Sequence, residues 1–314
     1  MFNKAFCYRG VVAVGTVTIS VGAYSALAGP VSLARTTAQT SPGAAAVETA
    51  VPPANRLSPK PPSDRRVLLY GDSLAAESQA SFVAALASAG ITKVIADTFG
   101  GTAICDWFSQ MRHDAAGMHP DAVVVEFSGN ALTPCMRAEN GIALSGTAYF
   151  HKYAADTAEV LEIFTPGHTS VFFTGAPISR SAERAHDLTT AVLHAIYATL
   201  AESTPYGHYT DAGASVLLDG RWTQTLPCLP REPCTGGHDA TGTPVNVVRA
   251  PDGGHFCPGA PAAVHGVTAA CPVWSSGAWR FGNAMAAPVI EQLAPFAAAN
   301  NAESPIRSTR ATEN

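Results

Sequence analysis

Short apolar runs alternate with segments of helical periodicity between Asp64 and Ala298, and this alternation restricts the fold more than any other feature. Strands that are apolar along their whole length are typical of a parallel sheet with helices on both faces. We therefore predict an α/β fold in three layers, with helices on both sides of a central, mostly parallel five-stranded sheet. The expected strands are Val67–Tyr70, Lys93–Ala96, Asp121–Phe127, Ser170–Thr174 and Val245–Val248, and the expected helices are Leu74–Ala89, Tyr149–Phe164, His186–Glu202 and Ala284–Phe296.

The N-terminal segment has the pattern of a secretory signal peptide. Lys4 and Arg9 precede an uncharged, largely apolar run that ends in the small residues Ala26-Leu27-Ala28. This order predicts a signal peptide over residues 1–28, with cleavage after Ala28. An uncleaved membrane anchor is the alternative, because the run approaches the ~20 residues that span a bilayer. We expect a secreted or cell-envelope protein that meets a membrane only if this segment is retained.

The rest of the chain divides into a linker, one domain and a tail. Residues 29–63 are rich in Ala, Thr and Pro, which predicts a flexible linker. Residues 64–298 form a single domain, and the polar residues 299–314 form a flexible tail. With a net charge of −5 the chain has no excess of basic groups for binding nucleic acid. We expect a monomer.

The seven cysteines become an even number once the signal peptide is removed, because Cys7 lies within it. An even number of cysteines in an exported chain indicates disulfide bonds, although the sequence alone does not fix their pairing. A zinc site formed by Cys228, Cys234 and His238 is an alternative, but the spacing of these residues matches no paired zinc motif. The remaining cysteines are Cys105, Cys135, Cys228, Cys234, Cys257 and Cys271.

Four short motifs follow predicted strands, where ligands bind in a parallel α/β sheet. Gly71-Asp72-Ser73-Leu74 places a serine hydroxyl at the start of a helix, although Asp and Ser also serve there as simple N-caps. Phe99-Gly100-Gly101-Thr102 and Ser128-Gly129-Asn130 follow the next two strands, and Asp252-Gly253-Gly254-His255 follows the last. Each motif alone is an ordinary turn. Together they predict a serine nucleophile, a histidine base and a carboxylate that orients the imidazole.

The order and spacing of these motifs resemble the SGNH hydrolases, also called the GDSL esterase/lipase family, of the exported actinobacterial type. The resemblance extends from Val67 to the closing helix and implies the flavodoxin-like SGNH fold. It implies that Ser73 is the nucleophile, His255 the general base and Asp252 the carboxylate that orients the base. The oxyanion hole would consist of the Ser73 and Gly101 amides and the Asn130 side chain, with Gly100 as the alternative to Gly101.

The chain departs from the family pattern at two motifs. The third motif of the family reads G-x-N-D, whereas this chain has Ser128-Gly129-Asn130-Ala131. The second motif lacks the Asn that commonly precedes its glycine. Neither departure removes a group with an expected chemical role, but the bonding inside the third loop is expected to differ.

The resemblance implies a secreted serine esterase that hydrolyses O-acyl esters through an acyl-enzyme, without a cofactor or a metal. The expected substrate is an ester-bearing small molecule, glycan or glycolipid. Two alternatives stay open. One is an O-acyltransferase that uses the same triad, and the other is a non-catalytic envelope or carbohydrate-binding protein on the same fold.

Within this family fold, three disulfides are expected to brace the site. Cys105 would pair with Cys135, Cys257 with Cys271, and Cys228 with Cys234. Asp106 and Trp107 are candidates for lining the substrate pocket. The pair Arg221-Trp222 either binds a sugar or forms a structural stack of Arg on Trp.

Overall fold

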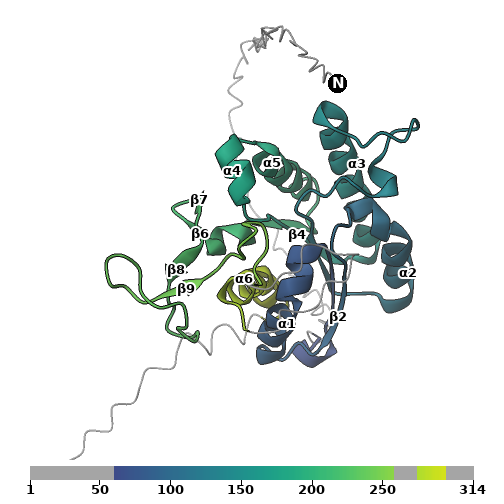
Figure 1. The fold of residues 1–314 in the computed structure, drawn as a ribbon. Coiled ribbons are helices and arrows are strands. Elements are labelled where there is room, and N and C mark those ends of the chain that lie inside the picture. Colours follow the sequence, from purple (N-terminus) through teal and green to yellow (C-terminus); the bar gives the residue numbers. More distant parts are fainter. Residues whose placement is uncertain (1–59, 258–273, 295–314) are drawn as a thin grey trace, which may run out of the picture. The chain divides into compact units, whose positions relative to one another are not determined.

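A five-stranded sheet forms the centre of the molecule (Figure 1). The computed structural model describes residues 60–257 and 274–294. The strand order is β2-β1-β3-β4-β5, and every neighbouring pair is parallel, which confirms the predicted fold class. The strands are β1 (Arg66–Gly71), β2 (Lys93–Thr98), β3 (Ala122–Glu126), β4 (Ser170–Thr174) and β5 (Gly207–Thr210).

Helices cover both faces of this sheet. Successive side chains of a strand point to opposite faces, so Val67 and Leu69 of β1 pack on one core and Leu68 and Tyr70 on the other. The first core is closed by α1 and α6, which lie side by side (Figure 1), and the second by α2, α3 and α5. These helices are α1 (Ser73–Ser88), α2 (Phe108–Met118), α3 (Gly146–Phe164), α5 (Thr189–Ala201) and α6 (Ser276–Leu293).

The prediction for the last strand of the sheet is wrong. The predicted strand, observed as β9 (Val245–Val247), pairs antiparallel with β8 (Thr225–Pro227) in a separate two-stranded sheet. The fifth place in the main sheet belongs to β5, whose four residues are all only half-buried at the sheet edge. Because β5 carries no apolar run, the hydrophobic pattern did not reveal it. A further hairpin consists of β6 (Leu217–Leu218) and β7 (Arg221–Trp222).

The predicted helices are present, with shifted ends. The helix predicted from His186 begins at Thr189, because His186 adopts a left-handed conformation (φ 51°) and ends a separate helix, α4 (Arg180–Ala185). The closing helix starts well before Ala284, because the Ser275 side chain accepts a hydrogen bond from the Ala278 amide and caps it. Helix α2 was not predicted, since only two of its residues are buried and its sequence is polar on average.

The predicted signal peptide and C-terminal tail lie outside the described residues, as does most of the predicted linker. The domain boundaries therefore stay predictions. The last linker residues do contact the domain, since Lys60 Nζ donates to Asp121 Oδ2 at 2.6 Å and Pro62–Asp64 form a 3-10 turn. Within residues 60–257 and 274–294, every helix is too short or too polar to span a bilayer.

Helix α6 packs unusually close to α1, the helix that follows the first motif. A Cβ at Gly282 would lie 2.6 Å from the Ser78 carbonyl oxygen and 2.8 Å from the Phe82 amide nitrogen. At the start of α6, a Cβ at Gly277 would lie 2.0 Å from the Val248 carbonyl oxygen. Two glycines therefore let α6 lie tightly between α1 and the segment that leads to His255.

Replacement of Gly282 by Ala should destabilise the protein, because the added methyl meets backbone atoms that cannot move aside. We expect a loss of about 1–3 kcal/mol in the free energy of unfolding, the range for overpacked cores. The matched control is Gly117→Ala in α2, where an added Cβ meets no atom within 4 Å. That variant should gain about 0.5–1 kcal/mol, as Gly to Ala does inside helices. Urea unfolding measures both, and equal stability of Gly282→Ala and wild type would contradict the packing described.

Candidate active site

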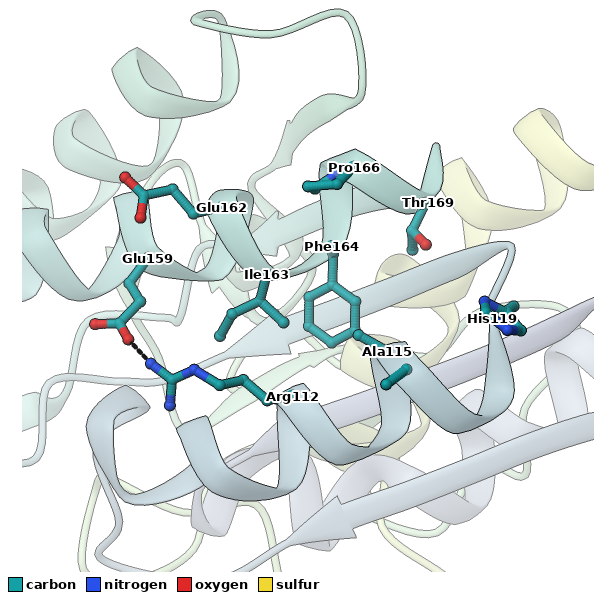
Figure 2. Close-up of a pocket in the computed structure, with 11 residues that line it drawn as sticks. Arg112, Ala115, His119, Glu159, Glu162, Ile163, Phe164, Pro166 and Thr169 are labelled. Carbon is teal, nitrogen blue, oxygen red and sulfur yellow. Dashed lines mark hydrogen bonds and ion pairs between the residues drawn. The ribbon is translucent and has the colours of Figure 1, made fainter.

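A pocket of about 600 Å³ lies between α2 and α3, at the end of the sheet opposite to the four motifs (Figure 2). Its walls include Ile163 and Phe164, and an ion pair between Arg112 and Glu159 crosses its rim. Thr169, which immediately precedes β4, marks it as lying at the amino ends of the strands. Parallel α/β sheets bind ligands at the carboxyl ends, so the predicted site lies elsewhere.

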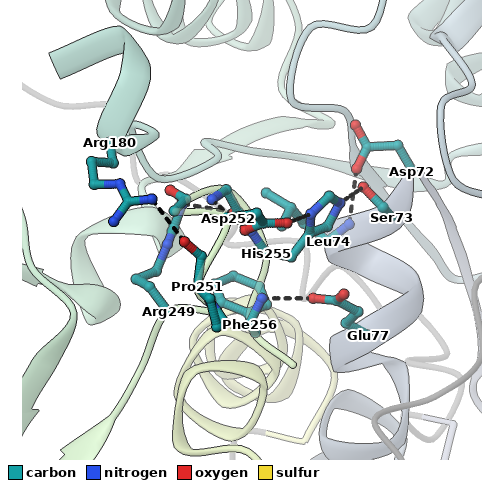
Figure 3. A network of polar contacts seen from close by, with 12 residues as sticks. Asp72, Ser73, Leu74, Glu77, Arg180, Arg249, Pro251, Asp252, His255 and Phe256 are labelled. Carbon is teal, nitrogen blue, oxygen red and sulfur yellow. Dashed lines mark hydrogen bonds and ion pairs between the residues drawn. The ribbon is translucent and has the colours of Figure 1, made fainter. Parts of the chain in front are cut away.

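Ser73, His255 and Asp252 form one hydrogen-bonded chain (Figure 3). His255 Nε2 lies 3.0 Å from Ser73 Oγ, and His255 Nδ1 lies 2.6 Å from Asp252 Oδ2. When Nδ1 carries its proton and donates it to Asp252, Nε2 is free to accept from the serine hydroxyl. The structure thus brings together the three residues that the motifs predict as nucleophile, base and orienting carboxylate.

A sharp turn between β1 and α1 presents Ser73. The strand ends at Gly71, where a Cβ would lie 2.3 Å from Ala75 Cβ and 2.7 Å from the Glu126 carbonyl oxygen. Asp72 is the N-cap, with Oδ1 accepting from the Leu74 amide at 3.0 Å. Ser73 therefore occupies the first position of α1 and is half-buried, with its hydroxyl directed at His255.

The loop around His255 keeps Asp252 ionised. Burial alone would raise the pKa of Asp252, but hydrogen bonds from the His255 and Gly254 amides and from the His255 ring outweigh it and leave this pKa below its usual value. The two amides donate to Oδ1 at 3.0 and 2.8 Å, which leaves Oδ2 for the imidazole. An ionised Asp252 holds the imidazole in the tautomer that can accept a proton from Ser73.

Three N–H donors at this corner are available to a ligand. The Ser73 and Gly101 amides have no hydrogen-bond partner within the described ranges. Asn130 Nδ2 uses one hydrogen for Asp72 Oδ2 at 2.8 Å and retains the other. The Gly101 loop is tied to the corner by the Phe99 amide, which donates to the Gly71 carbonyl at 3.0 Å. Gly101 has a φ of 81° and is half-buried, whereas the alternative Gly100 is buried.

Asp72 connects the first and third motifs. The sequence indicated only that Asp72 could cap the helix and did not reveal this second role. Its Oδ2 accepts from the Ser128 amide at 2.8 Å, the Ser128 hydroxyl at 2.6 Å and Asn130 Nδ2 at 2.8 Å. Burial raises the pKa of Asp72, and the Ser128 hydrogen bonds oppose this effect. Ser128 stands where the family pattern has glycine, so this departure adds a hydroxyl donor beneath the site.

Glu126 is a second buried carboxyl at this corner. Its Oε2 accepts from the Ala75 amide at 3.0 Å, and its Oε1 has no partner in the part of the chain that the structure describes. Burial, reinforced by the negative charge of Asp72, raises the pKa of Glu126 well above its usual value. The only sequence signal for it was a lone carboxylate within a predicted apolar strand.

A smaller pocket of about 360 Å³ opens at the carboxyl end of β2, beside the Gly101 loop. Asp106 and Trp107, the candidates for lining the substrate pocket, line this pocket together with Asp97, Phe99 and Thr102. The Asp106 carboxylate accepts from the Ala103 amide at 2.8 Å, and Trp107 Nε1 donates to Thr102 Oγ1 at 3.1 Å. Asp97 is half-buried, and its side-chain carboxylate has no hydrogen-bond partner among the described residues. The pocket thus offers an aromatic wall and an unused carboxylate.

The expected stack of Arg on Trp involves a different arginine. Arg180 of α4 lies over the Trp222 ring at 5.3 Å, whereas Arg221 pairs with Glu183. Trp222 Nε1 donates to the Gly253 carbonyl at 3.0 Å, and Arg180 Nη2 donates to the Pro251 carbonyl at 2.7 Å. Both side chains therefore support the loop that carries Asp252 and His255.

Two of the three expected disulfides are present. Cys105–Cys135, with a Cα–Cα distance of 6.1 Å, joins the segments that follow the Gly101 and Asn130 loops, and Cys228–Cys234 closes the proline-rich loop at 5.6 Å. The second bond overturns the alternative of a zinc site at Cys228, Cys234 and His238. Cys271 lies outside the described residues, so its pairing with Cys257 stays a prediction. Within the described ranges, no three His, Cys, Asp or Glu side chains are grouped to bind a metal.

Replacement of Glu126 by Gln should stabilise the protein at neutral and alkaline pH. A carboxyl whose pKa is raised by folding contributes most below its ordinary value of 4.5, and this contribution is lost as the pH rises towards the folded pKa. Glu126→Gln removes this dependence and can keep the bond from the Ala75 amide. We expect about 1–3 kcal/mol of extra stability at pH 8, the range for a buried polar group without a partner.

Urea unfolding of both proteins between pH 4 and pH 8 measures this difference, which should shrink towards pH 4. Glu291→Gln, at an exposed position of α6, is the control and should leave the pH dependence unchanged. A stability difference between Glu126→Gln and wild type that is the same at every pH would contradict a raised pKa for Glu126.

Comparison with known proteins places the chain in a family. It has no match among curated proteins. Similar solved structures include a candidate acylhydrolase from Bacteroides fragilis (15% identity, 73% of this chain and 87% of that chain, TM-score 0.44) and a GDSL-like lipase from Bacteroides thetaiotaomicron (13%, 73% and 88%, 0.42). Another is a catalytic mutant of an acetylxylan esterase from Geobacillus stearothermophilus (13%, 48% and 78%, 0.37). A family model described as "Protein of unknown function (DUF459)" matches residues 66–262, which is more than half of the chain. The chain therefore belongs to the DUF459 family, which has an SGNH-like fold.

Proposed function

We propose that this protein is an exported serine esterase that hydrolyses O-acyl esters through a covalent acyl-enzyme. The observation that carries the proposal is the hydrogen-bonded chain from Asp252 through His255 to Ser73, with distances of 2.6 and 3.0 Å. A nucleophile, a base and an orienting carboxylate in this order are the groups that acyl transfer requires. The SGNH-like fold of the family agrees with this chemistry.

In the first half of the reaction, Ser73 Oγ attacks the ester carbonyl carbon while His255 Nε2 takes the serine proton. The carbonyl oxygen becomes an oxyanion, and the Asp252 carboxylate stabilises the imidazolium. The Ser73 amide, the Gly101 amide and the second hydrogen of Asn130 Nδ2 are the donors for this oxyanion. Collapse of the intermediate breaks the bond to the alcohol, which leaves with the proton of His255.

In the second half, water replaces the alcohol. His255 Nε2 takes a proton from the water as its oxygen attacks the acyl-enzyme, and the same three donors hold the new oxyanion. Breakage of the bond to Ser73 Oγ releases the carboxylic acid, and His255 returns the proton to the serine. The four steps use only groups of the chain and one water.

Export is part of the proposal. Disulfide bonds persist in oxidising compartments and are rare in the cytosol. The bonds Cys105–Cys135 and Cys228–Cys234 support an exported protein, as does the predicted signal peptide over residues 1–28.

The pocket beside the Gly101 loop supports an ester of a glycan or glycolipid as the substrate. Binding pockets combine apolar walls with a few polar groups that fix the orientation of the ligand. Here Trp107 and the exposed Phe99 supply aromatic surface, and Asp97 supplies a carboxylate that can accept hydrogen bonds from sugar hydroxyls. The Phe99 amide bonds to Gly71, two residues before Ser73, so the pocket begins close to the reacting ester.

Replacement of Ser73 by Ala should reduce the hydrolysis of nitrophenyl acetate by roughly 10⁴–10⁶-fold, because the nucleophile is lost. Asn130→Ala should reduce kcat by about 10²–10³-fold, as removal of one oxyanion donor typically does. A fluorophosphonate should label Ser73 in the wild type. Ser88→Ala, at the exposed end of the same helix, is the matched control.

The contrary outcomes are distinct. Turnover that survives Ser73→Ala would exclude Ser73 as the nucleophile. A folded wild-type protein without turnover and without labelling would instead support a non-catalytic carbohydrate-binding protein. Transfer of the acyl group to an added sugar rather than to water would identify an O-acyltransferase.

Replacement of Asp97 by Asn should weaken the binding of acetylated sugars while sparing small esters, because it removes a charged acceptor from the pocket. We expect KM for a partially acetylated disaccharide, which keeps free hydroxyls that can donate to Asp97, to rise about tenfold, which corresponds to about 1.4 kcal/mol. The kcat/KM for nitrophenyl acetate should stay within about twofold of wild type, since this ester has no hydroxyl that could donate to Asp97. Asp219→Asn, in the β6–β7 turn, is the control. Equal changes for both substrates would contradict a sugar-binding role of Asp97.

A further inference from the structure

Glu77 connects the helix of Ser73 to the loop of His255. It lies on α1 four residues after Ser73, and therefore on the same face of the helix. Its Oε2 accepts a hydrogen bond from the Phe256 amide at 2.7 Å, and the residue is only 8% exposed. Figure 3 shows this side chain reaching from α1 to the loop. The amide that directly follows His255 is thus held by the helix that carries the nucleophile.

Arg249 holds the same loop from its buried side. Its Nη2 donates to the Gly254 carbonyl at 2.8 Å, and its guanidinium lies over the Phe256 ring at 5.3 Å. The residue is fully buried, and its Nε and Nη1 have no hydrogen-bond partner within residues 60–257 and 274–294. The peptide groups on both sides of His255 are therefore bonded to buried charged side chains.

Packing alone does not account for these two residues. Burial of a charge costs several kcal/mol unless a partner compensates it, and apolar residues of similar volume are often as stable or more so. Burial lowers the pKa of Arg249 to about 10, so the guanidinium stays charged at neutral pH. Burial raises the pKa of Glu77. The hydrogen bond from the Phe256 amide and the attraction of His255 lower it and so oppose this effect. The negative charge of Glu77 thus acts on the imidazole.

We propose that Glu77 is a positioning residue that fixes His255 relative to Ser73 and stabilises its imidazolium form, and that Arg249 is its buried counter-charge. This inference rests on the proposed esterase function. Because Ser73 and Glu77 stand one turn apart on a rigid helix, the bond to Phe256 sets the distance between nucleophile and base. In its ionised form the Glu77 carboxylate favours the positive imidazolium ring that forms when Ser73 loses its proton.

Several other charges face the same imidazole. Asp252 contacts it from its own loop, and Asp72 acts on it from the start of α1. Arg249 balances Asp252 and Glu77 from the buried side, and Arg180 of α4 approaches the loop through the Pro251 carbonyl. The effect of each charge on His255 has a definite sign. Loss of a carboxylate makes the imidazolium less stable, and loss of a guanidinium makes it more stable.

The test uses two substitutions at Glu77 in the full chain, with nitrophenyl acetate as the substrate. Glu77→Gln keeps an oxygen that can accept from the Phe256 amide and removes only the charge. We expect an unchanged KM, a kcat about tenfold lower, and an acid limb of the kcat/KM–pH profile that moves about 0.5–1 unit to lower pH. Glu77→Ala also removes the hydrogen bond and should lower kcat about tenfold further, since misplacement of the base reduces the rate.

A third variant, Arg249→Met, separates the charge effect from loss of stability. Removal of the cation should move the acid limb to higher pH, opposite to Glu77→Gln, whereas simple destabilisation would not give shifts of opposite sign. Rates are expressed per fluorophosphonate-labelled Ser73, so that unfolded molecules do not count. Glu232→Gln is the control, because Glu232 is a buried carboxylate bonded to Arg280 and Ser276. This substitution should lower the stability of the protein without moving the acid limb.

The failure of this inference differs from the failure of the proposed function. A wild-type protein without turnover and without Ser73 labelling would overturn the esterase itself. Wild-type turnover with an acid limb that stays in place in both Glu77→Gln and Arg249→Met would overturn the role of Glu77. A lower kcat in Glu77→Ala alone, with no change in either pH profile, would also overturn it, because a purely structural contact gives that result.

Discussion

A fully buried carboxylate organises the end of the sheet where the four motifs were expected to meet. Asp72 accepts hydrogen bonds from the Leu74 amide, from the amide and hydroxyl of Ser128, and from the Asn130 side chain. A buried carboxylate is unfavourable without such donors, so β1, α1 and the loop after β3 must keep their relative positions for the fold to be stable. Ser73 directly follows this carboxylate in the chain, and the Asn130 side chain is one of its donors. The distance between Ser73 and Asn130 is therefore set by the hydrogen bonds that the buried Asp72 carboxylate requires.

The sheet could largely be predicted from the sequence because β1, β3 and β4 are buried almost throughout and read as apolar runs. Strand β2 has no buried residue but still carries the apolar run Val94-Ile95-Ala96. Strand β5 escaped prediction because its sequence, Gly-His-Tyr-Thr, has no hydrophobic pattern. Segment Val245–Val248 was misassigned because Val248 packs on the core that α1 and α6 close, while Val245–Val247 pair with β8 outside the main sheet. An apolar run indicates that a segment is buried, but it does not indicate which part of the fold the segment packs against.

The sequence predicted which residues meet at the candidate site, although one premise of that prediction was wrong. Ser73, Asp252 and His255 meet, yet His255 does not follow a strand of the main sheet. Its loop is held by α1, α4 and the β6–β7 hairpin through Glu77, Arg180 and Trp222. Such supports could not be read from the sequence, because a charged residue in an Ala-rich helix resembles any solvent-exposed one. Their role depends on burial, which only the tertiary packing determines.

The Cys105–Cys135 bond has a further consequence for local unfolding. The chain between these cysteines contains α2, which buries only Met111 and Asp114, and the central strand β3. A helix with so few buried contacts is expected to open more often than its neighbours. Because the crosslink spans it, opening of α2 leaves the Gly101 and Asn130 loops tethered to each other. Helix α2 can thus fluctuate while the crosslink keeps the two loops together.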